Sequence, residues 1–118
     1  MRATREKFGE FVRRERREKE IGLREMAKMI GVSPTYLSKV ERDEFLPPIE
    51  DKVRKIAAII GCDPDELLAR AGRVSSDLSD IIKQHPRELA ALLRTTKGLT
   101  AGAVAKLARQ VQKAQDDE

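Results

Sequence analysis

Hydrogen-bonding side chains at helical spacing mark one face of the stretch SPTYLSKVER, residues 33–42. Thr35 and Lys39 stand four residues apart, so a helix that begins at Pro34 places both on its outward face. Lysine suits the acceptor atoms of guanine, and threonine can bond to several base edges. Ser33 and the free backbone amides at the helix start suit a phosphate oxygen. The stretch therefore predicts a surface for double-stranded DNA.

Further side chains extend this predicted DNA-binding patch: Arg24, Tyr36, Ser38 and Arg42. Arg24 stands near the start of the preceding helix, where a cation suits a DNA phosphate. Tyr36 lies to the side of the outward face. Two roles fit Tyr36 equally well: it could cover the junction between the helices, or it could contact a phosphate. We interpret Pro34 as structural.

Catalytic chemistry finds little support in the sequence. His85 is the only histidine and Cys62 the only cysteine, so the sequence indicates no metal cluster or nucleophilic pair of the usual kind. His85 precedes Pro86, where it suits a helix cap, and we interpret Cys62 as a packing residue. No glycine-rich phosphate loop occurs. We expect neither enzyme activity nor a cofactor or metal.

Two short helices must position the patch. The first is predicted over residues 23–30, with an inward apolar stripe of Met26, Ala27 and Ile30. Gly31 suits the left-handed helix end, and Ser33 followed by Pro34 caps and starts the second helix. Leu37 and Val40 would then face the first helix. Ala27 is small where the two helices should cross.

The segment GLREMAKMIGVSPTYLSKVERDEFLPP resembles the helix-turn-helix of the lambda-repressor-like transcriptional regulators, the Xre or Cro family, and the likeness continues through Val74. The resemblance implies a five-helix DNA-binding domain whose second short helix enters the major groove. It also implies an ion pair between Arg16 and Glu41. Glu20 and Asp43 stand where the family usually has glycine.

The charge distribution agrees with a local DNA-binding surface. The chain has 118 residues with 24 Lys and Arg against 20 Asp and Glu, a net charge of +4. Residues 1–28 hold 10 basic and 6 acidic residues, so the remainder is neutral and the excess positive charge is local. No apolar run approaches the length of a membrane span, and a single cysteine suits a reducing compartment. We expect a cytoplasmic protein without a membrane partner.

We predict an all-α fold with two parts. Residues 1–73 form the five-helix domain, with further helices over about 5–19, 49–60 and 64–71. Residues 74–118 add three short helices that form a C-terminal dimerisation region and end in a frayed tail from Gln112. An apolar set in this region exceeds what a five-helix domain needs: Leu92, Leu93, Val104, Leu107 and Val111.

Two functions fit these patterns. The first is a sequence-specific transcriptional regulator, a repressor by its resemblance, that binds an inverted-repeat operator as a homodimer. The alternative is a protein-binding module, such as an antitoxin-like partner that acts through the C-terminal helices. Salt-dependent binding to a discrete DNA site would distinguish the regulator from a pure protein binder.

Overall fold

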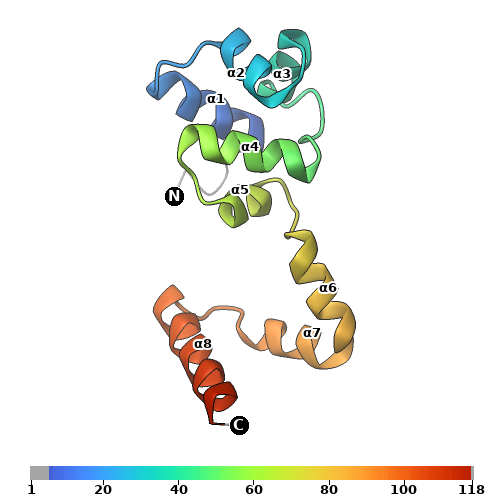
Figure 1. Ribbon diagram of the computed structural model, residues 1–118, viewed down its shortest axis with the longest axis vertical. Coiled ribbons are helices and arrows are strands. Elements are labelled where there is room, and N and C mark those ends of the chain that lie inside the picture. Colours follow the sequence, from blue (N-terminus) through green and yellow to red (C-terminus); the bar gives the residue numbers. More distant parts are fainter. Residues whose placement is uncertain (1–5, 118) are drawn as a thin grey trace. The chain divides into compact units, whose positions relative to one another are not determined.

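The structure, a computed structural model, describes residues 6–117, which contain eight helices and no strand. The chain divides into two compact units, Met1–Ser76 and Asp77–Glu118. The first holds α1 (Phe8–Glu18), α2 (Leu23–Ile30), α3 (Pro34–Glu41), α4 (Glu50–Ile60) and α5 (Pro64–Arg70) (Figure 1). Then follow α6 (Ser76–Gln84), α7 (Pro86–Thr95) and α8 (Ala101–Asp116). The predicted all-α fold is confirmed, and none of the described helices is long and apolar enough to cross a membrane.

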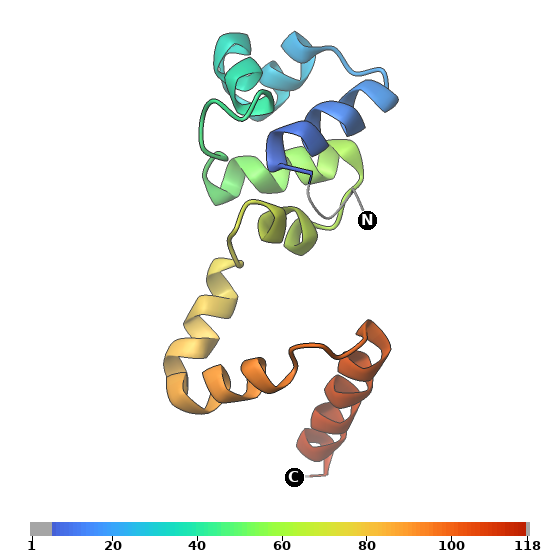
Figure 2. The same ribbon diagram turned by 180° about the vertical axis from the view of Figure 1, so that it is seen from behind.

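The core of the first unit is built from all five of its helices, with α4 packed against α1, α2 and α5 (Figures 1 and 2). Fully enclosed side chains come from each helix: Val12, Met26, Ile30, Leu37, Val40, Val53, Ile56, Leu67 and Leu68. Ala27 is also fully enclosed, as its place at the predicted crossing of α2 and α3 requires. The apolar periodicity of the sequence therefore identified the inward faces of α2 and α3.

The turn between α2 and α3 follows from three neighbouring residues. Gly31 ends α2 with φ = 78°, in the left-handed region that glycine adopts readily. The Ser33 hydroxyl oxygen then accepts a hydrogen bond of 3.0 Å from the backbone N–H of Tyr36, and Pro34 fills the first turn of α3. Each of these roles was predicted from the sequence.

Two residues other than glycine also adopt left-handed backbone conformations. These are Glu20, with φ = 56°, and Asp43, with φ = 59°. They are the two positions at which the family resemblance implied glycine. Asp43 gains something that glycine could not provide, because its Oδ1 accepts a 2.8 Å hydrogen bond from the backbone N–H of Gly9 in the first turn of α1.

Gly9 marks a close approach between α1 and the end of α3. A Cβ atom at this position would lie 2.2 Å from the carbonyl oxygen of Val40 and 2.8 Å from that of Glu41. Both atoms belong to the backbone, so they cannot move aside like the end of a flexible side chain. A glycine inside an otherwise helical pattern was the available signal for this contact. Gly9 lies within the helix predicted over about residues 5–19, but the sequence pattern alone indicated no role for it.

The first helix begins later than predicted. The backbone N–H of Lys7 donates to Glu10 Oε1 at 3.1 Å, which marks the residue before α1, so the helix starts at Phe8. Residue 5, where the prediction placed the start, lies outside the described residues.

Side-chain contacts with α4 secure the last residues of the first unit. Arg54 Nη2 donates to the hydroxyl of the buried Ser75 at 2.6 Å, and Glu50 Oε1 accepts from the backbone N–H of Ser76 at 3.2 Å. Arg73 donates to the carbonyl oxygens of Pro47 and Pro48 in the loop before α4. The first unit therefore continues through Ser76.

The second unit buries no residue among 77–117. Thr100 caps α8 by accepting a 3.1 Å hydrogen bond from the N–H of Ala103. The predicted frayed tail from Gln112 is corrected, because α8 continues to Asp116. Good helix formers without a breaker, and a 3.1 Å hydrogen bond from Gln112 Nε2 to Asp116 Oδ1, extend the helix.

Candidate nucleic-acid interface

A buried ion pair joins α1 to α3. Arg16 Nε donates to Glu41 Oε2 at 2.7 Å and Arg16 Nη2 donates to Glu41 Oε1 at 2.8 Å. The third contact runs from Arg16 Nη1 to the carbonyl oxygen of Ile21 at 2.8 Å. The hydrogen bond with Glu41 raises the pKa of Arg16 above its usual value despite burial. The pair implied by the family resemblance is present, and it fixes where α3 lies on α1.

Basic side chains surround a hollow of about 370 Å³ over this ion pair. We call it the arginine hollow, lined by Arg13, Arg16, Arg17, Leu23, Ser38, Glu41 and Arg42. Arg13 and Arg17 stand one helical turn apart on α1, as do Ser38 and Arg42 on α3. Four arginines and one glutamate give the hollow an excess of positive charge.

A second hollow of about 350 Å³ brings four of the predicted DNA-binding residues together. This α2–α3 hollow is lined by Leu23, Arg24, Pro34, Thr35, Ser38 and Arg42. The two hollows share Leu23, Ser38 and Arg42, so together they form one depression along the outward side of α3. Arg24 and Thr35 are exposed at its surface.

The remaining predicted residues lie outside both hollows. The Lys39 ammonium lies 5.3 Å from the centre of the Phe45 ring, and the rings of Tyr36 and Phe45 are 5.7 Å apart. Tyr36 is partly buried against the core, so the proposed role in covering the helix junction has structural support. Ser33 is exposed, and its hydroxyl caps α3. Phe45 was not singled out in the sequence, where nothing but its aromatic type after the helix could have indicated it.

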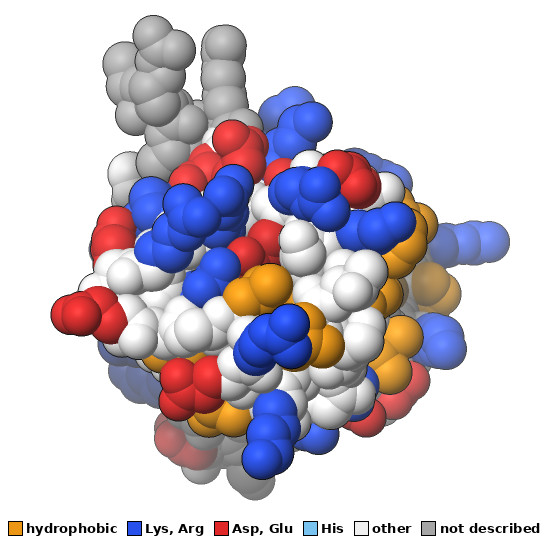
Figure 3. Space-filling view, turned by 90° about the horizontal axis from the view of Figure 1, so that it is seen from above, with side chains coloured by type: hydrophobic (Ala, Val, Ile, Leu, Met, Phe, Trp, Pro, Cys, Tyr) orange, Lys and Arg blue, Asp and Glu red, His pale blue; other side chains and the backbone are white. Residues whose placement is uncertain are grey.

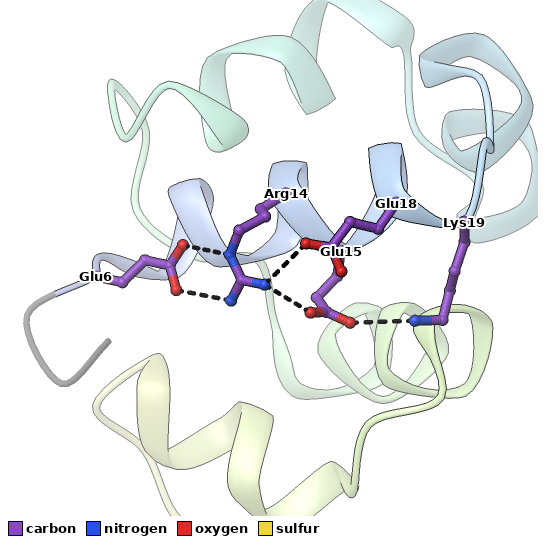
Figure 4. Close-up of polar contacts among 5 residues, drawn as sticks. All are labelled: Glu6, Arg14, Glu15, Glu18 and Lys19. Atoms are coloured by element: carbon purple, nitrogen blue, oxygen red, sulfur yellow. Dashed lines mark hydrogen bonds and ion pairs between the residues drawn. The ribbon is translucent and has the colours of Figure 1, made fainter. Parts of the chain in front are cut away.

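Arg14 on α1 is in a different situation from Arg13 and Arg17. Its Nε and Nη2 donate to the two carboxylate oxygens of Glu6, each at 2.9 Å, and its Nη1 donates to Glu15 at 2.9 Å and Glu18 at 3.3 Å (Figure 4). Lys19 continues the network with a 3.1 Å contact to Glu15. The hydrogen bond from Arg14 lowers the pKa of Glu6. The charge of Arg14 is therefore already compensated.

The face that carries α2 and α3 shows several groups of Lys and Arg side chains separated by uncharged surface (Figure 3). Most acidic side chains on this face lie toward its edge. Such a surface suits a polyanion, because the basic groups can meet phosphates while the uncharged surface between them contacts sugars and bases.

The two residues considered for catalysis are separate from this surface in sequence and in role. Cys62 Sγ donates to the carbonyl of Asp63 at 3.4 Å, and burial raises the pKa of its thiol, so the unreactive protonated form is favoured. His85 occupies the N-cap position of α7, although its side chain makes no capping hydrogen bond. Among residues 6–117, no group of His, Cys, Asp and Glu could hold a metal ion.

The chain matches a known protein family over most of the first unit. The model described as "Helix-turn-helix domain" matches residues 9–73, more than half of the chain. The chain belongs to this helix-turn-helix family. The resemblance seen in the sequence is thereby confirmed at the family level. Proteins with this helix-turn-helix fold are transcription regulators and do not form an enzyme class. This agrees with the prediction that the protein is not an enzyme.

Two curated relatives each match about half of the chain. The ImmF control region 10 kDa protein of Bacillus phage phi105 is 39% identical over 57 residues, covering 48% of this chain and 62% of the phage protein. An uncharacterised HTH-type transcriptional regulator of Mycobacterium tuberculosis is 36% identical over 64 residues, covering 54% of this chain and 45% of the regulator. The chain thus spans less than two thirds of the length of these relatives.

Similar solved structures include two proteins that are described as regulators. SinR, described as the master regulator for biofilm formation and solved in complex with DNA, aligns with 52% of this chain and 97% of its own at 31% identity and a TM-score of 0.47. The clp gene regulator ClgR from Corynebacterium glutamicum aligns with 79% of this chain and 93% of its own at 27% identity and a TM-score of 0.49.

Proposed function

We propose that the protein is a sequence-specific DNA-binding transcriptional regulator of the Cro/C1 type, acting as a repressor on an inverted-repeat operator. The observation that carries this proposal is the depression along α3, where Arg24, Thr35, Ser38 and Arg42 come together on a basic face. α3 enters the major groove, with Thr35 and Lys39 at base edges. Arg24 and the start of α3 at Ser33 contact phosphates. The Mycobacterium tuberculosis relative, which is named as an HTH-type transcriptional regulator, supports this proposal.

Lys39→Ala tests the base-reading role of α3. We expect loss of discrimination between operator and random DNA, costing roughly 1 to 3 kcal/mol at the cognate site, because lysine bonds to guanine acceptors. Arg24→Ala should weaken binding to both DNAs about equally, since a phosphate contact carries no sequence information. Competition titrations measure both effects, with DNA from the protein's own promoter region as the first operator candidate.

Lys55→Ala is the matched control for these variants. Lys55 is an exposed cation of α4 that lines neither hollow, so its loss should leave the specificity ratio unchanged. If Lys39→Ala also left that ratio unchanged, the assignment of Lys39 to a base edge would be wrong.

We further propose a homodimer held by the second unit. Its apolar side chains are only partly covered within the described chain: Leu92, Leu93, Val104, Leu107 and Val111 are each 40–59% exposed. Val104, Leu107 and Val111 follow one another at three and four residues along α8, which is the spacing of a helix-pairing seam. Two such chains would present two recognition helices about 34 Å apart, one turn of DNA, to an inverted repeat.

Truncation after Ser76 tests the dimer. The shortened chain should remain folded, because its buried core lies entirely within α1–α5, but should become monomeric and lose most operator affinity. Light scattering reports the mass and thermal melting reports the fold. A truncated chain that still dimerises would place the interface in the first unit.

Charged substitutions in the full chain distinguish self-association from the alternative of a different protein partner. Val104→Lys with Leu107→Lys should give monomers, whereas Lys106→Glu, on an exposed position between them, should not. A wild-type chain that is monomeric at all concentrations would instead favour the alternative function of an antitoxin-like module, in which these helices bind a different protein.

A further inference from the structure

The arginine hollow holds more positive charge than the fold uses. Arg16 directs its guanidinium at Glu41 and at the carbonyl of Ile21, so Arg16 and Glu41 neutralise each other. The side chains of Arg13 and Arg17 are exposed and make no hydrogen bond or ion pair with any residue in the range 6–117. They point to a ligand rather than to a structural role.

The opposite wall of the hollow is also available. Arg42 makes a 3.3 Å contact with Glu44 in which both side chains are half exposed, and its Nε lies 3.4 Å from the carbonyl oxygen of Ser38. Exposed ion pairs of this kind contribute little and exchange readily for a stronger partner. Ser38 adds a hydroxyl donor on the same wall.

Neighbouring carboxylates form no ion pair with Arg13 or Arg17. On their other side, Arg13 and Arg17 border a hollow that also includes Glu6, Glu10 and Glu18. Arg14 binds Glu6 and Glu18 (Figure 4). The Glu10 carboxylate accepts a hydrogen bond from the backbone N–H of Lys7. The glutamates of α1 therefore all accept hydrogen bonds within the protein, whereas the side chains of Arg13 and Arg17 make none.

We propose that the arginine hollow is a phosphate-binding site that takes a backbone phosphate of DNA between α1 and α3. Guanidinium groups offer forked donors that match phosphate oxygens. The hollow continues into the α2–α3 hollow, so a strand whose phosphate lies between Arg13, Arg17 and Arg42 passes on toward Arg24. This inference rests on the proposed function and adds α1 to the DNA-binding surface.

The test is the double variant Arg13→Gln/Arg17→Gln in the full chain, with Arg14→Gln as the matched control. Fluorescence anisotropy gives the affinity for random and promoter DNA over a range of salt concentrations, and far-UV circular dichroism checks the fold. The double variant should bind both DNAs roughly tenfold more weakly, with the slope of log K against log salt reduced by about 1 to 2. The control should keep the wild-type slope, because the charge of Arg14 is compensated within the protein.

The outcomes separate the inference from the proposed function. A double variant with unchanged affinity and slope would overturn the phosphate site while leaving the DNA-binding function intact, whereas a wild-type chain that binds no DNA would overturn both. Inorganic phosphate is the second probe, compared with chloride at equal ionic strength through the NMR signals of the arginine Nε–H groups. A phosphate response lost in the double variant, without any change in DNA binding, would assign the hollow to a free phosphate compound and overturn the DNA assignment.

Discussion

Gly9→Ala is expected to unfold the first unit or to destabilise it by about 3 kcal/mol or more, above the usual range for overpacking. The added methyl carbon would lie 2.2 Å from the carbonyl oxygen of Val40, closer than any real contact. Separation of α1 from α3 would also break the hydrogen bond between the Gly9 N–H and Asp43. Thermal melting without DNA measures the loss.

Gly102→Ala provides the matched control for the glycine prediction. Gly102 lies within α8, and a Cβ atom there would meet the Thr100 hydroxyl at 3.9 Å, an ordinary contact. Alanine favours the helix over glycine by up to about 1 kcal/mol, so this variant should be neutral or stabilising. A Gly9→Ala protein with an unchanged midpoint would show that α1 does not approach α3 as closely as described.

Glu41→Gln should destabilise the first unit by about 3 to 5 kcal/mol, because Arg16 would keep its charge in a buried site without a compensating carboxylate. Arg16 is 7% exposed and Glu41 is 3% exposed, so solvent reaches little of either side chain. Denaturant unfolding gives the change in free energy.

Two comparisons make the ion-pair prediction specific. Glu44→Gln removes one partner of the half-exposed Arg42–Glu44 pair and should change stability by less than about 0.5 kcal/mol. Arg16→Met with Glu41→Leu removes both buried charges and should recover much of the stability lost in Glu41→Gln. If Glu41→Gln behaved like Glu44→Gln, the Arg16 charge would have to be solvated.

Local chemistry made the helix-turn-helix predictable from the sequence. The stop at Gly31, the cap at Ser33 and the inward faces of α2 and α3 each depend on residues within a few positions of one another. The family resemblance supplied the Arg16–Glu41 pair, which joins residues 25 positions apart. The tail from Gln112 was predicted wrongly because polarity was weighted above the helix propensity of Gln, Lys and Ala.

The site itself was harder to predict, since its parts meet only in three dimensions. The charged and polar surface of α1 gave no sign that Arg14 is held by three carboxylates while Arg13 and Arg17 face α3. The capping of α1 by Asp43 joins residues 34 positions apart, and the contact of Lys39 with Phe45 depends on how the chain turns after α3. The predicted DNA-binding residues stay predictions until binding is measured.

The placement of Tyr36 gives the protein a built-in optical probe. Tyr36 is the only tyrosine of the chain, which has no tryptophan, so the tyrosine-type ultraviolet emission comes from one ring on α3. That ring is partly buried against the core and lies 5.7 Å from the Phe45 ring, beside the Lys39 side chain. Any rearrangement of α3, or quenching by a base stacked near it, will therefore appear in the intrinsic fluorescence without a label.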